Sequence, residues 1–241
     1  MNQPKFVGFS TQKGGVGKTT LTTVMASYCH FVLDKKVAVM DCDYPQHNIV
    51  KLRDREVALI RSDPEYMNAF KKMGKQAYPV LGSSPENATV DMNRFIHPET
   101  GDKPYDIVFV DLPGTVNAAG VFKTIHRLNH VIIPIIADRL VIDSCLEFGT
   151  LIHENFTGKN EHLESVHFLW NCVVRSEKTF LYAETNAIIK ELGMSTLNTE
   201  LEQSVKFRKN GFRSTMFPIN KNYVKETMMV KLIEEIIDII F

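Results

Sequence analysis

The sequence predicts an α/β fold in which a mostly parallel, doubly wound sheet is flanked by helices, formed by a single domain of residues 1–241. Short apolar runs that end in Asp, Ser, Asn or Gly recur along the chain and alternate with longer, partly helical stretches. Such alternation is typical of βαβ units around a buried parallel sheet. A chain of 241 residues with 44% apolar residues is also long enough to bury one substantial core.

The apolar runs give the expected strands, which are residues 5–10, 36–43, 105–114, 130–138 and 166–172. The helices are expected at residues 18–33, 115–128, 140–155, 180–192 and 226–240. Residues 51–104 mix charged pieces with turns that contain Pro and Gly, and we expect one or two helices and loops there. In such sheets ligands bind outside the carboxyl ends of the strands, so functional residues are expected just after them.

Composition and charge argue against several classes of protein. Lys plus Arg (28) balance Asp plus Glu (28), so attraction to nucleic acid or to an anionic membrane has to come from a local patch. The four cysteines are widely separated, and the eight histidines show no metal-ligand spacing, so no disulfide framework, zinc site or iron–sulfur site is indicated. The N-terminus does not resemble a leader, and the apolar run from Val131 is too short to span a bilayer. We therefore expect a cytoplasmic protein.

Residues 10–20, STQKGGVGKTT, have most of the features of a phosphate-binding loop. The pattern GxxxxGK[ST] matches at its last three fixed positions, although Gln12 stands where the first Gly belongs. An apolar run enters the loop and a helical stretch leaves it, which is the context that a phosphate loop requires. The backbone N–H groups would face the phosphates at a helix N-terminus. The expected nucleotide-binding residues of the loop are Gly14, Gly15, Val16, Gly17, Lys18, Thr19 and Thr20.

The residue types in and after this loop predict a site for ATP and Mg²⁺. Lys18 would neutralise the β- and γ-phosphates, and the Thr19 hydroxyl would complete the Mg²⁺ sphere. Asp111 ends the apolar run YDIVFVD and would hold Mg²⁺ through water. Because Leu112 follows instead of Glu, the carboxylate that orients the attacking water has to come from elsewhere. The alternative is a glycine-rich turn with incidental lysines.

The segment KGGVGKTT resembles the deviant Walker A motif of the ParA/Soj/MinD family of P-loop ATPases, and the resemblance implies a single-domain P-loop NTPase fold. The earlier lysine is the signature of that family, and Lys13 occupies its position. The resemblance implies that Lys13 crosses the interface of a nucleotide-sandwich homodimer and contacts the partner's nucleotide. A cation supplied in trans can stabilise the charge that phosphoryl transfer builds up, so hydrolysis and dimerisation would be coupled.

The segment VMDCDYPQHN resembles the DxDPQ element of the same family. Carried over by position, Asp43 becomes the water-positioning catalytic carboxylate, and Asp41 a Mg²⁺-shell or supporting group. Tyr44 stands between Asp43 and Pro45, where the family runs directly from Asp to Pro. The alternative is that both carboxylates only cap the end of a strand.

The segment FLWNCVVRSEKT resembles the part of the family in which an Asn contacts adenine. Asn171 occupies that position. A buried Asn that satisfies backbone groups at the end of a strand is the alternative.

Residues 203–225 contain no acidic residue and could contact DNA. The basic residues of this stretch are Lys206, Arg208, Lys209, Arg213, Lys221 and Lys225, and the first four are the expected DNA-binding residues. Such a patch would engage phosphates without sequence preference and with salt-sensitive affinity. The alternative is a solvated basic face whose aromatic residues belong to the core.

The family resemblance also implies partners and a cellular role. In the family, ATP-bound dimers bind DNA non-specifically and release it after hydrolysis is stimulated by a centromere-binding partner. The resemblance therefore implies a nucleoid-associated partition ATPase with weak turnover until a ParB-like or cargo protein stimulates it. The details around DCDYPQ look like ParA-type proteins of conjugative transposons, so the cargo could be a plasmid or a conjugative element.

Other classes of function stay open. A MinD-like protein would use the amphipathic segment 226–241 to attach to a membrane, but acidic residues dominate its polar face, so we expect a helix packed on the sheet and no membrane partner. A scaffold that binds ATP with negligible turnover is a second alternative. An electron-transfer or cluster-loading relative, and a small-molecule kinase or ligase, have no supporting motif.

Overall fold

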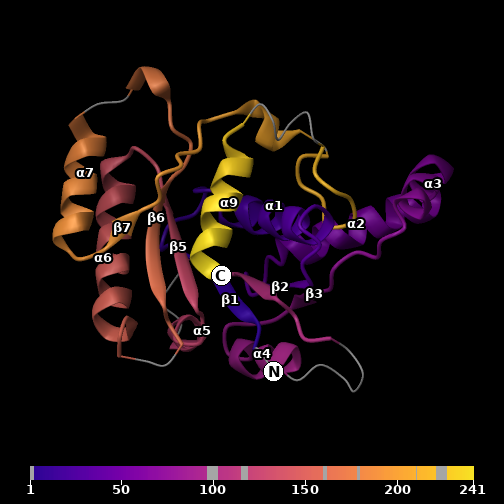
Figure 1. The fold of residues 1–241 in the computed structure, drawn as a ribbon, viewed down its shortest axis with the longest axis horizontal. Helices are drawn as coiled ribbons and strands as arrows, with labels where there is room; N and C mark the ends of the chain where they lie inside the picture. The colour runs from indigo at the N-terminus through magenta and orange to yellow at the C-terminus, as the bar shows by residue number, and fades with distance from the viewer. Residues whose placement is uncertain are drawn as a thin grey trace.

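The computed structural model describes residues 3–96, 103–114, 119–159, 162–177, 180–209, 211–220 and 227–241. Its strands form one seven-stranded sheet in the order β3-β2-β4-β1-β5-β6-β7, and every pair of neighbours is parallel (Figure 1). The predicted α/β class with a parallel, doubly wound sheet is therefore confirmed. The strands are β1 (Lys5–Phe9), β2 (Val37–Asp41), β3 (Val80–Gly82), β4 (Ile107–Asp111), β5 (His130–Ile135), β6 (Ser165–Trp170) and β7 (Ser195–Thr196).

The central strands are apolar because both of their faces are covered. β2, β4 and β5 are buried along their whole length. The register aligns their carboxyl ends, because Asp111 of β4 pairs with Phe9 of β1 on one side and with Asp41 of β2 on the other. The segments that follow β1, β2 and β4 therefore start side by side at one edge of the sheet.

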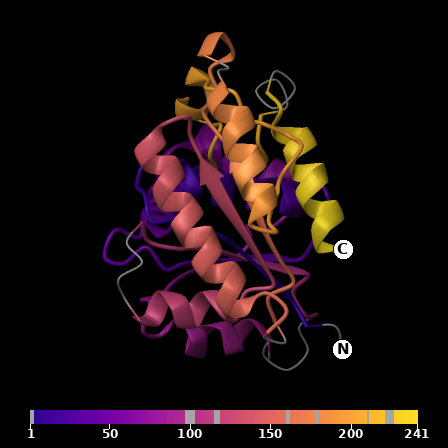
Figure 2. The same ribbon diagram turned by 90° about the vertical axis from the view of Figure 1, so that its left-hand side faces the viewer.

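Helices cover both faces of the sheet. One apolar core lies under α4, α5, α6 and α7, and a second lies under α1 and α9. Figure 2 shows α6 and α7 together on the near side and α9 beyond them. The helices are α1 (Lys18–Phe31), α2 (Asn48–Ser62), α3 (Pro64–Met73), α4 (Ala88–Ile96), α5 (Ala119–Ile125), α6 (Arg139–Phe156), α7 (Phe180–Glu191) and α9 (Met229–Ile240).

Residues 48–96 contain more regular structure than the one or two helices that the sequence predicts. Three helices, α2, α3 and α4, and the short strand β3 lie there. Figure 1 shows α2 and α3 extending away from the sheet, and no residue of α3 is buried. The two helices meet at Asp63 and Pro64, a pair typical of turns, and α2 buries only Ile49 and Ile60, so the charged sequence reads as irregular.

The other helices agree with the predicted ranges to within a few residues. The first four residues of the expected helix 115–128 and the first of the expected helix 226–240 lie outside the described residues. α5 ends at Ile125 instead of residue 128.

The C-terminal helix packs on the sheet, as the sequence predicts. The side chains of Met229, Leu232, Ile233 and Ile236 in α9 are at most 1% exposed and belong to the core that also contains Val7. The apolar face of α9 is thus already covered, which removes the main argument for a membrane-attaching tail. Across the described parts of the chain, no helix is long and apolar enough to span a membrane.

A buried histidine at the start of β5 predicts how stability depends on pH. His130 is 3% exposed, its Nδ1 lies 2.9 Å from Ser165 Oγ, and its Nε2 lies 3.6 Å from Glu164 Oε2. The pKa of His130 is lowered to about 4, mainly by burial; Glu164 opposes this shift, and Lys5 and His167 contribute to it. Between pH 6.5 and 4 the unfolded chain therefore binds more protons at this position, and stability falls as the pH falls.

We expect the wild type to lose about 1 to 2 kcal/mol more unfolding free energy than His130→Gln between pH 7 and pH 5. Urea denaturation at both pH values measures this difference. His153→Gln, on α6, is the control and should follow the wild-type curve. Parallel curves for wild type and His130→Gln would contradict the prediction.

Candidate functional site

The loop between β1 and α1 is shaped by glycines and ends at an open helix N-terminus. Gly15 (φ 79°) and Gly17 (φ 95°) adopt left-handed backbone conformations that favour glycine. A Cβ on Gly17 would also lie 2.6 Å from Asn171 Nδ2. The first turn of α1 has no acidic residue and no side-chain cap. Its N–H groups are therefore available to an anion, as the predicted phosphate loop requires.

Lys18 is buried at the base of this loop. Its side chain is 8% exposed, and its Nζ donates a hydrogen bond to the Lys13 carbonyl oxygen at 2.8 Å. Burial lowers the pKa of Lys18, and the nearby carboxylates of Asp111 and Asp43 oppose that shift. An ammonium group has three donors, so the contact with Lys13 leaves donors for phosphate oxygens.

Thr19 and Asp111 meet as a potential Mg²⁺ site. The Thr19 hydroxyl donates to Asp111 Oδ2 at 2.8 Å. Asp111 is fully buried, and its other oxygen, Oδ1, has no hydrogen-bond partner among the described residues. The pKa of Asp111 is raised to about 7, mainly by burial; the Thr19 hydrogen bond and Lys18 oppose this shift, and Asp41 and Asp43 contribute to it.

These donors fit Mg²⁺, which prefers oxygen ligands and usually keeps several waters. The unpartnered Asp111 oxygen is a buried acceptor that a cation, or a water bound to one, would satisfy. Within the described residues, no group of three or more His, Cys, Asp or Glu side chains is arranged to hold a metal ion. Mg²⁺ would thus depend on nucleotide and water oxygens as well as on Thr19 and Asp111.

Asp41 holds the start of α2 in place. Its Oδ2 accepts hydrogen bonds from the backbone N–H groups of Ile49 (2.8 Å) and Val50 (3.1 Å), and its Oδ1 accepts one from the Asp43 N–H (3.2 Å). The carboxylate is fully buried. Of the two roles expected for Asp41, this geometry favours the supporting one, because both oxygens already have partners.

Asp43 follows the end of β2 and interacts electrostatically with Asp41 and with Lys18 of the phosphate loop. Burial raises the pKa of the Asp43 carboxyl, Asp41 raises it further, and Lys18 and a hydrogen bond from Asn48 Nδ2 (3.4 Å) lower it. The charges of Asp43 and Lys18 are thus near enough to interact. Tyr44 is 60% exposed. The ring of this extra residue lies edge-on to that of His47, with 5.6 Å between the ring centroids.

Asn171 contacts the phosphate loop itself. Its Nδ2 donates to the Val16 carbonyl oxygen at 2.8 Å, and its backbone N–H donates to Ile135 O at 2.8 Å. The side chain thus satisfies a backbone group, as the alternative to adenine contact proposes. Contact with adenine stays a prediction.

The basic stretch is divided between the surface and the loop. Arg208 and Lys209 are exposed, whereas Arg213 Nη1 lies 3.4 Å from Thr20 Oγ1 in the phosphate loop. Phe212 is fully buried, with Phe207 edge-on against it at 4.8 Å between ring centroids. These two aromatic residues therefore belong to the core. Lys221 and Lys225 lie outside the described residues.

Two further contacts of the loop could not be predicted from the sequence. Thr11 Oγ1 lies 3.0 Å from Cys145 Sγ of α6 and 3.4 Å from the Lys13 N–H nitrogen. A Cβ on Gly114, after β4, would lie 3.4 Å from Lys18 Nζ.

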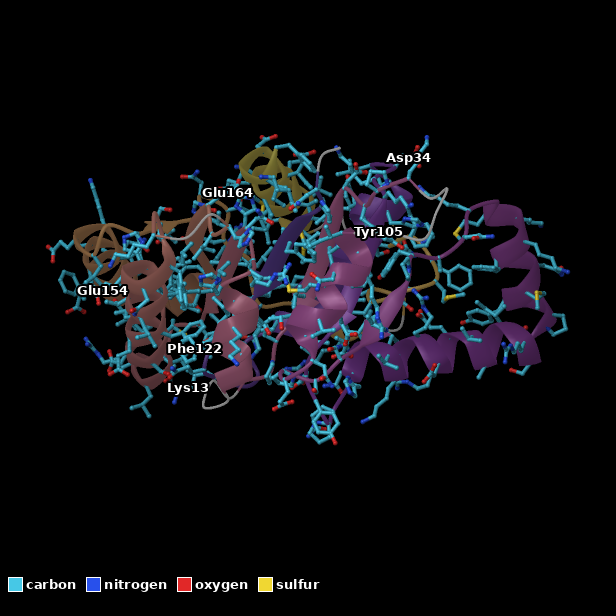
Figure 3. All side chains as sticks on the ribbon, turned by 90° about the horizontal axis from the view of Figure 1, so that it is seen from below. Lys13, Asp34, Tyr105, Phe122, Glu154 and Glu164 are labelled. Atoms are coloured by element: carbon cyan, nitrogen blue, oxygen red, sulfur yellow. The ribbon has the colours of Figure 1, made fainter. Side chains whose placement is uncertain are left out.

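Figure 3 shows Lys13 at the margin opposite Asp34, Tyr105 and Glu164, which precede strands.

A cleft of about 770 Å³ opens beside the loop. Thr19 and Thr23 of α1 form one wall, α2 and α3 contribute a second, and residues 208–220 form a third. The cleft contains the predicted Mg²⁺ ligand Thr19 and the guanidinium of Arg213.

Comparisons with known proteins agree with this geometry. The model of the CobQ/CobB/MinD/ParA nucleotide binding domain matches residues 7–215. An uncharacterized protein of Borreliella burgdorferi, BBD21, is 34% identical over 110 residues. That alignment covers 42% of this chain and 42% of the relative, so the chain matches less than half of the length of that protein.

Two solved structures show the same fold at low sequence identity. A plasmid partition protein from Borrelia burgdorferi, bound to AMPPNP, has a TM-score of 0.61 at 15% identity, over 98% of this chain and 99% of that one. The septum site-determining protein MinD of Pyrococcus horikoshii, complexed with Mg-ADP, has a TM-score of 0.64 at 16% identity, over 97% and 96%.

The family model covers most of the chain, including the phosphate loop, Asp43, Asp111 and Asn171. The chain therefore belongs to the CobQ/CobB/MinD/ParA nucleotide-binding family.

Proposed function

We propose that this chain is a ParA-like ATPase that binds Mg-ATP, forms a homodimer in the ATP state and positions DNA cargo such as a plasmid or conjugative element. The observation that carries the proposal is the convergence of Lys18, Thr19, Asp111 and Asp43 at the carboxyl edge of the sheet. Family membership supports nucleotide binding, and the low net charge of the chain is compatible with DNA binding through a local patch.

The residues of the site have distinct tasks in ATP hydrolysis. The N–H groups of the loop and Lys18 bind the phosphates, and Asp43 orients a water molecule toward the γ-phosphate. Thr19 and Asp111 are the residues that would hold Mg²⁺, which neutralises charge on the phosphate oxygens when it is bound. Asp41 keeps Asp43 and α2 in position, because its carboxylate bonds to both.

Two sets of basic side chains would serve the dimer interface and the binding of DNA. Lys13 is only half-buried, so its side chain is available to the nucleotide of a second subunit. Arg208 and Lys209, with Lys206 on the same turn, form a basic surface for DNA phosphates. A ParB-like partner would stimulate hydrolysis and release the DNA.

The first test measures oligomeric state and turnover together. We expect the wild type to dimerise only with ATP and Mg²⁺ in light scattering. Lys13→Ala should bind nucleotide but lose turnover by about 100-fold or more, because a cation acting in trans stabilises the transition state. Lys51→Ala, an exposed lysine of α2, is the control. A wild type that binds ATP without any change in oligomeric state would contradict the dimer.

Asp43→Asn separates an ATPase from a scaffold that only binds ATP. The amide retains the shape of the side chain but cannot accept a proton, so turnover should fall by about 100-fold while ATP affinity stays within a few-fold of the wild type. Phosphate release and a nucleotide titration measure the two effects. Unchanged turnover would show that Asp43 is not catalytic, and negligible turnover of the wild type with partner and DNA present would favour the scaffold.

A double variant tests the basic surface. Arg208→Ala with Lys209→Ala should weaken binding to duplexes of unrelated sequence about equally. It should also reduce the slope of log affinity against log salt by about two. Fluorescence anisotropy with ATP present measures both quantities. Lys71→Ala with Lys72→Ala, an exposed pair on α3, is the matched control, and identical slopes for wild type and the Arg208/Lys209 variant would favour a solvated face.

A further inference from the structure

We propose that Arg213 is a nucleotide-binding residue whose guanidinium contacts the α-phosphate. The sequence groups Arg213 with the DNA-binding residues Lys206, Arg208 and Lys209. The structure brings the guanidinium of Arg213 into contact with the phosphate loop, at Thr20. The assignment rests on the proposed function, since it needs a nucleotide in that loop.

The position of Thr20 identifies the phosphate. In a phosphate loop the backbone N–H groups bind the α- and β-phosphates, the lysine reaches the β- and γ-phosphates, and the following hydroxyl reaches Mg²⁺. Lys18 and Thr19 fill the last two roles here. Thr20, one residue further into α1, then lies beside the α-phosphate, and Arg213 Nη1 is 3.4 Å from its hydroxyl.

The backbone on either side of Arg213 is anchored. Phe212 is fully buried in the core under α1. Ser214 Oγ accepts hydrogen bonds from the Met216 (3.1 Å) and Phe217 (2.9 Å) N–H groups. Thr215 donates from its N–H (2.8 Å) and its hydroxyl (2.6 Å) to Glu56 Oε2 on α2. The segment therefore presents Arg213 at a fixed place, and little further ordering is needed when an anion binds.

The side chain of Arg213 is nevertheless free to reorient. It is exposed, and its hydrogen bond to Thr20 is long and uncharged at the acceptor. Arg213 lines the same cleft as Thr19, so no protein segment separates it from the predicted Mg²⁺ ligand. An arginine fork matches the geometry of phosphate oxygens, and a charge-assisted contact is stronger than the bond that it replaces.

The charges near the α-phosphate favour a second cation. Lys18 lies against the Lys13 carbonyl and Gly114 at the other end of the loop. The nearby carboxylate of Glu56 is already bonded to Thr215, which limits its competition for Arg213. Arg55 lines the opposite wall of the cleft, and its Nε donates to the Lys51 carbonyl oxygen of its own helix at 3.3 Å. Arg55 therefore offers a matched charge in the same cleft that does not touch the loop.

The test is a titration of fluorescent ATP and ADP analogues with Mg²⁺, in the absence of DNA, on wild type, Arg213→Ala, Arg213→Lys and Arg55→Ala. We expect Arg213→Ala to weaken ATP and ADP about tenfold and to the same degree, because both nucleotides carry the α-phosphate. Arg213→Lys should recover part of the loss, and Arg55→Ala should stay within twofold of wild type. Thermal unfolding confirms that each variant is folded.

Three results would overturn the assignment. Arg213→Ala could bind both nucleotides as the wild type does, which would mean that Arg213 is not a nucleotide-binding residue and belongs with the proposed DNA-binding residues. A loss for ATP alone would place Arg213 at the γ-phosphate. An equal loss in Arg55→Ala would mean that only the general positive field of the cleft matters. If the wild type bound neither nucleotide, the proposed function would fail as well. The three results above concern a wild type that does bind nucleotide, so failure of the assignment alone can be told apart from failure of the proposed function.

Discussion

The burial of carboxylates at the carboxyl edge of the sheet is the constraint on which the site depends. Asp41 and Asp111 are fully buried on neighbouring strands, directly opposite each other in the register. Burial of an ionised carboxyl is unfavourable unless hydrogen bonds or cations compensate it. Asp41 is compensated by three backbone N–H groups, whereas Asp111 has one hydroxyl donor and an oxygen without a partner. The two carboxylates therefore differ in kind: Asp41 is structurally satisfied, and Asp111 is open to a ligand.

The same edge connects the nucleotide site to α2. Asp41 bonds to the first N–H groups of α2, so the position of that helix depends on the end of β2. One turn further along α2, Arg53 donates from Nε to the Thr215 hydroxyl at 2.8 Å, and Glu56 accepts from Thr215. Because Thr215 follows Arg213 by two residues, α2 is bonded both to the carboxylate edge and to the segment that crosses the N-terminus of α1. A displacement of the carboxylate edge or of the segment with Thr215 would therefore also shift the projecting helices α2 and α3.

Much of the fold could be predicted from the sequence, because five strands are apolar runs long enough to be recognised. β3 and β7 could not, since Val80–Gly82 and Ser195–Thr196 are too short to show a period. The helices α2 and α3 are largely exposed and meet at Asp63 and Pro64, a pair that reads as a turn in the sequence. The phosphate loop, Asp43 and Asp111 can be predicted because each belongs to a short motif of neighbouring residues. Their functional roles stay predictions. The contact between Arg213 and Thr20 joins positions 193 residues apart, so no local pattern could indicate it.

The segment after β4 approaches the phosphate loop closely at Gly114. A Cβ there would lie 3.4 Å from the Gly14 nitrogen and from Lys18 Nζ, and 3.5 Å from the Lys13 carbonyl carbon. The backbone at Gly114 therefore lies close against the phosphate loop. The Lys18 ammonium donates a hydrogen bond to the Lys13 carbonyl beside Gly114. The backbone of Lys13 therefore lies between the side chain of Lys18 and Gly114. Any phosphate that draws Lys18 away from this carbonyl changes the support of Lys13 as well. The two lysines of the loop are thus mechanically linked through one hydrogen bond, which gives the nucleotide a direct way to alter the residue that faces a second subunit in the proposed dimer.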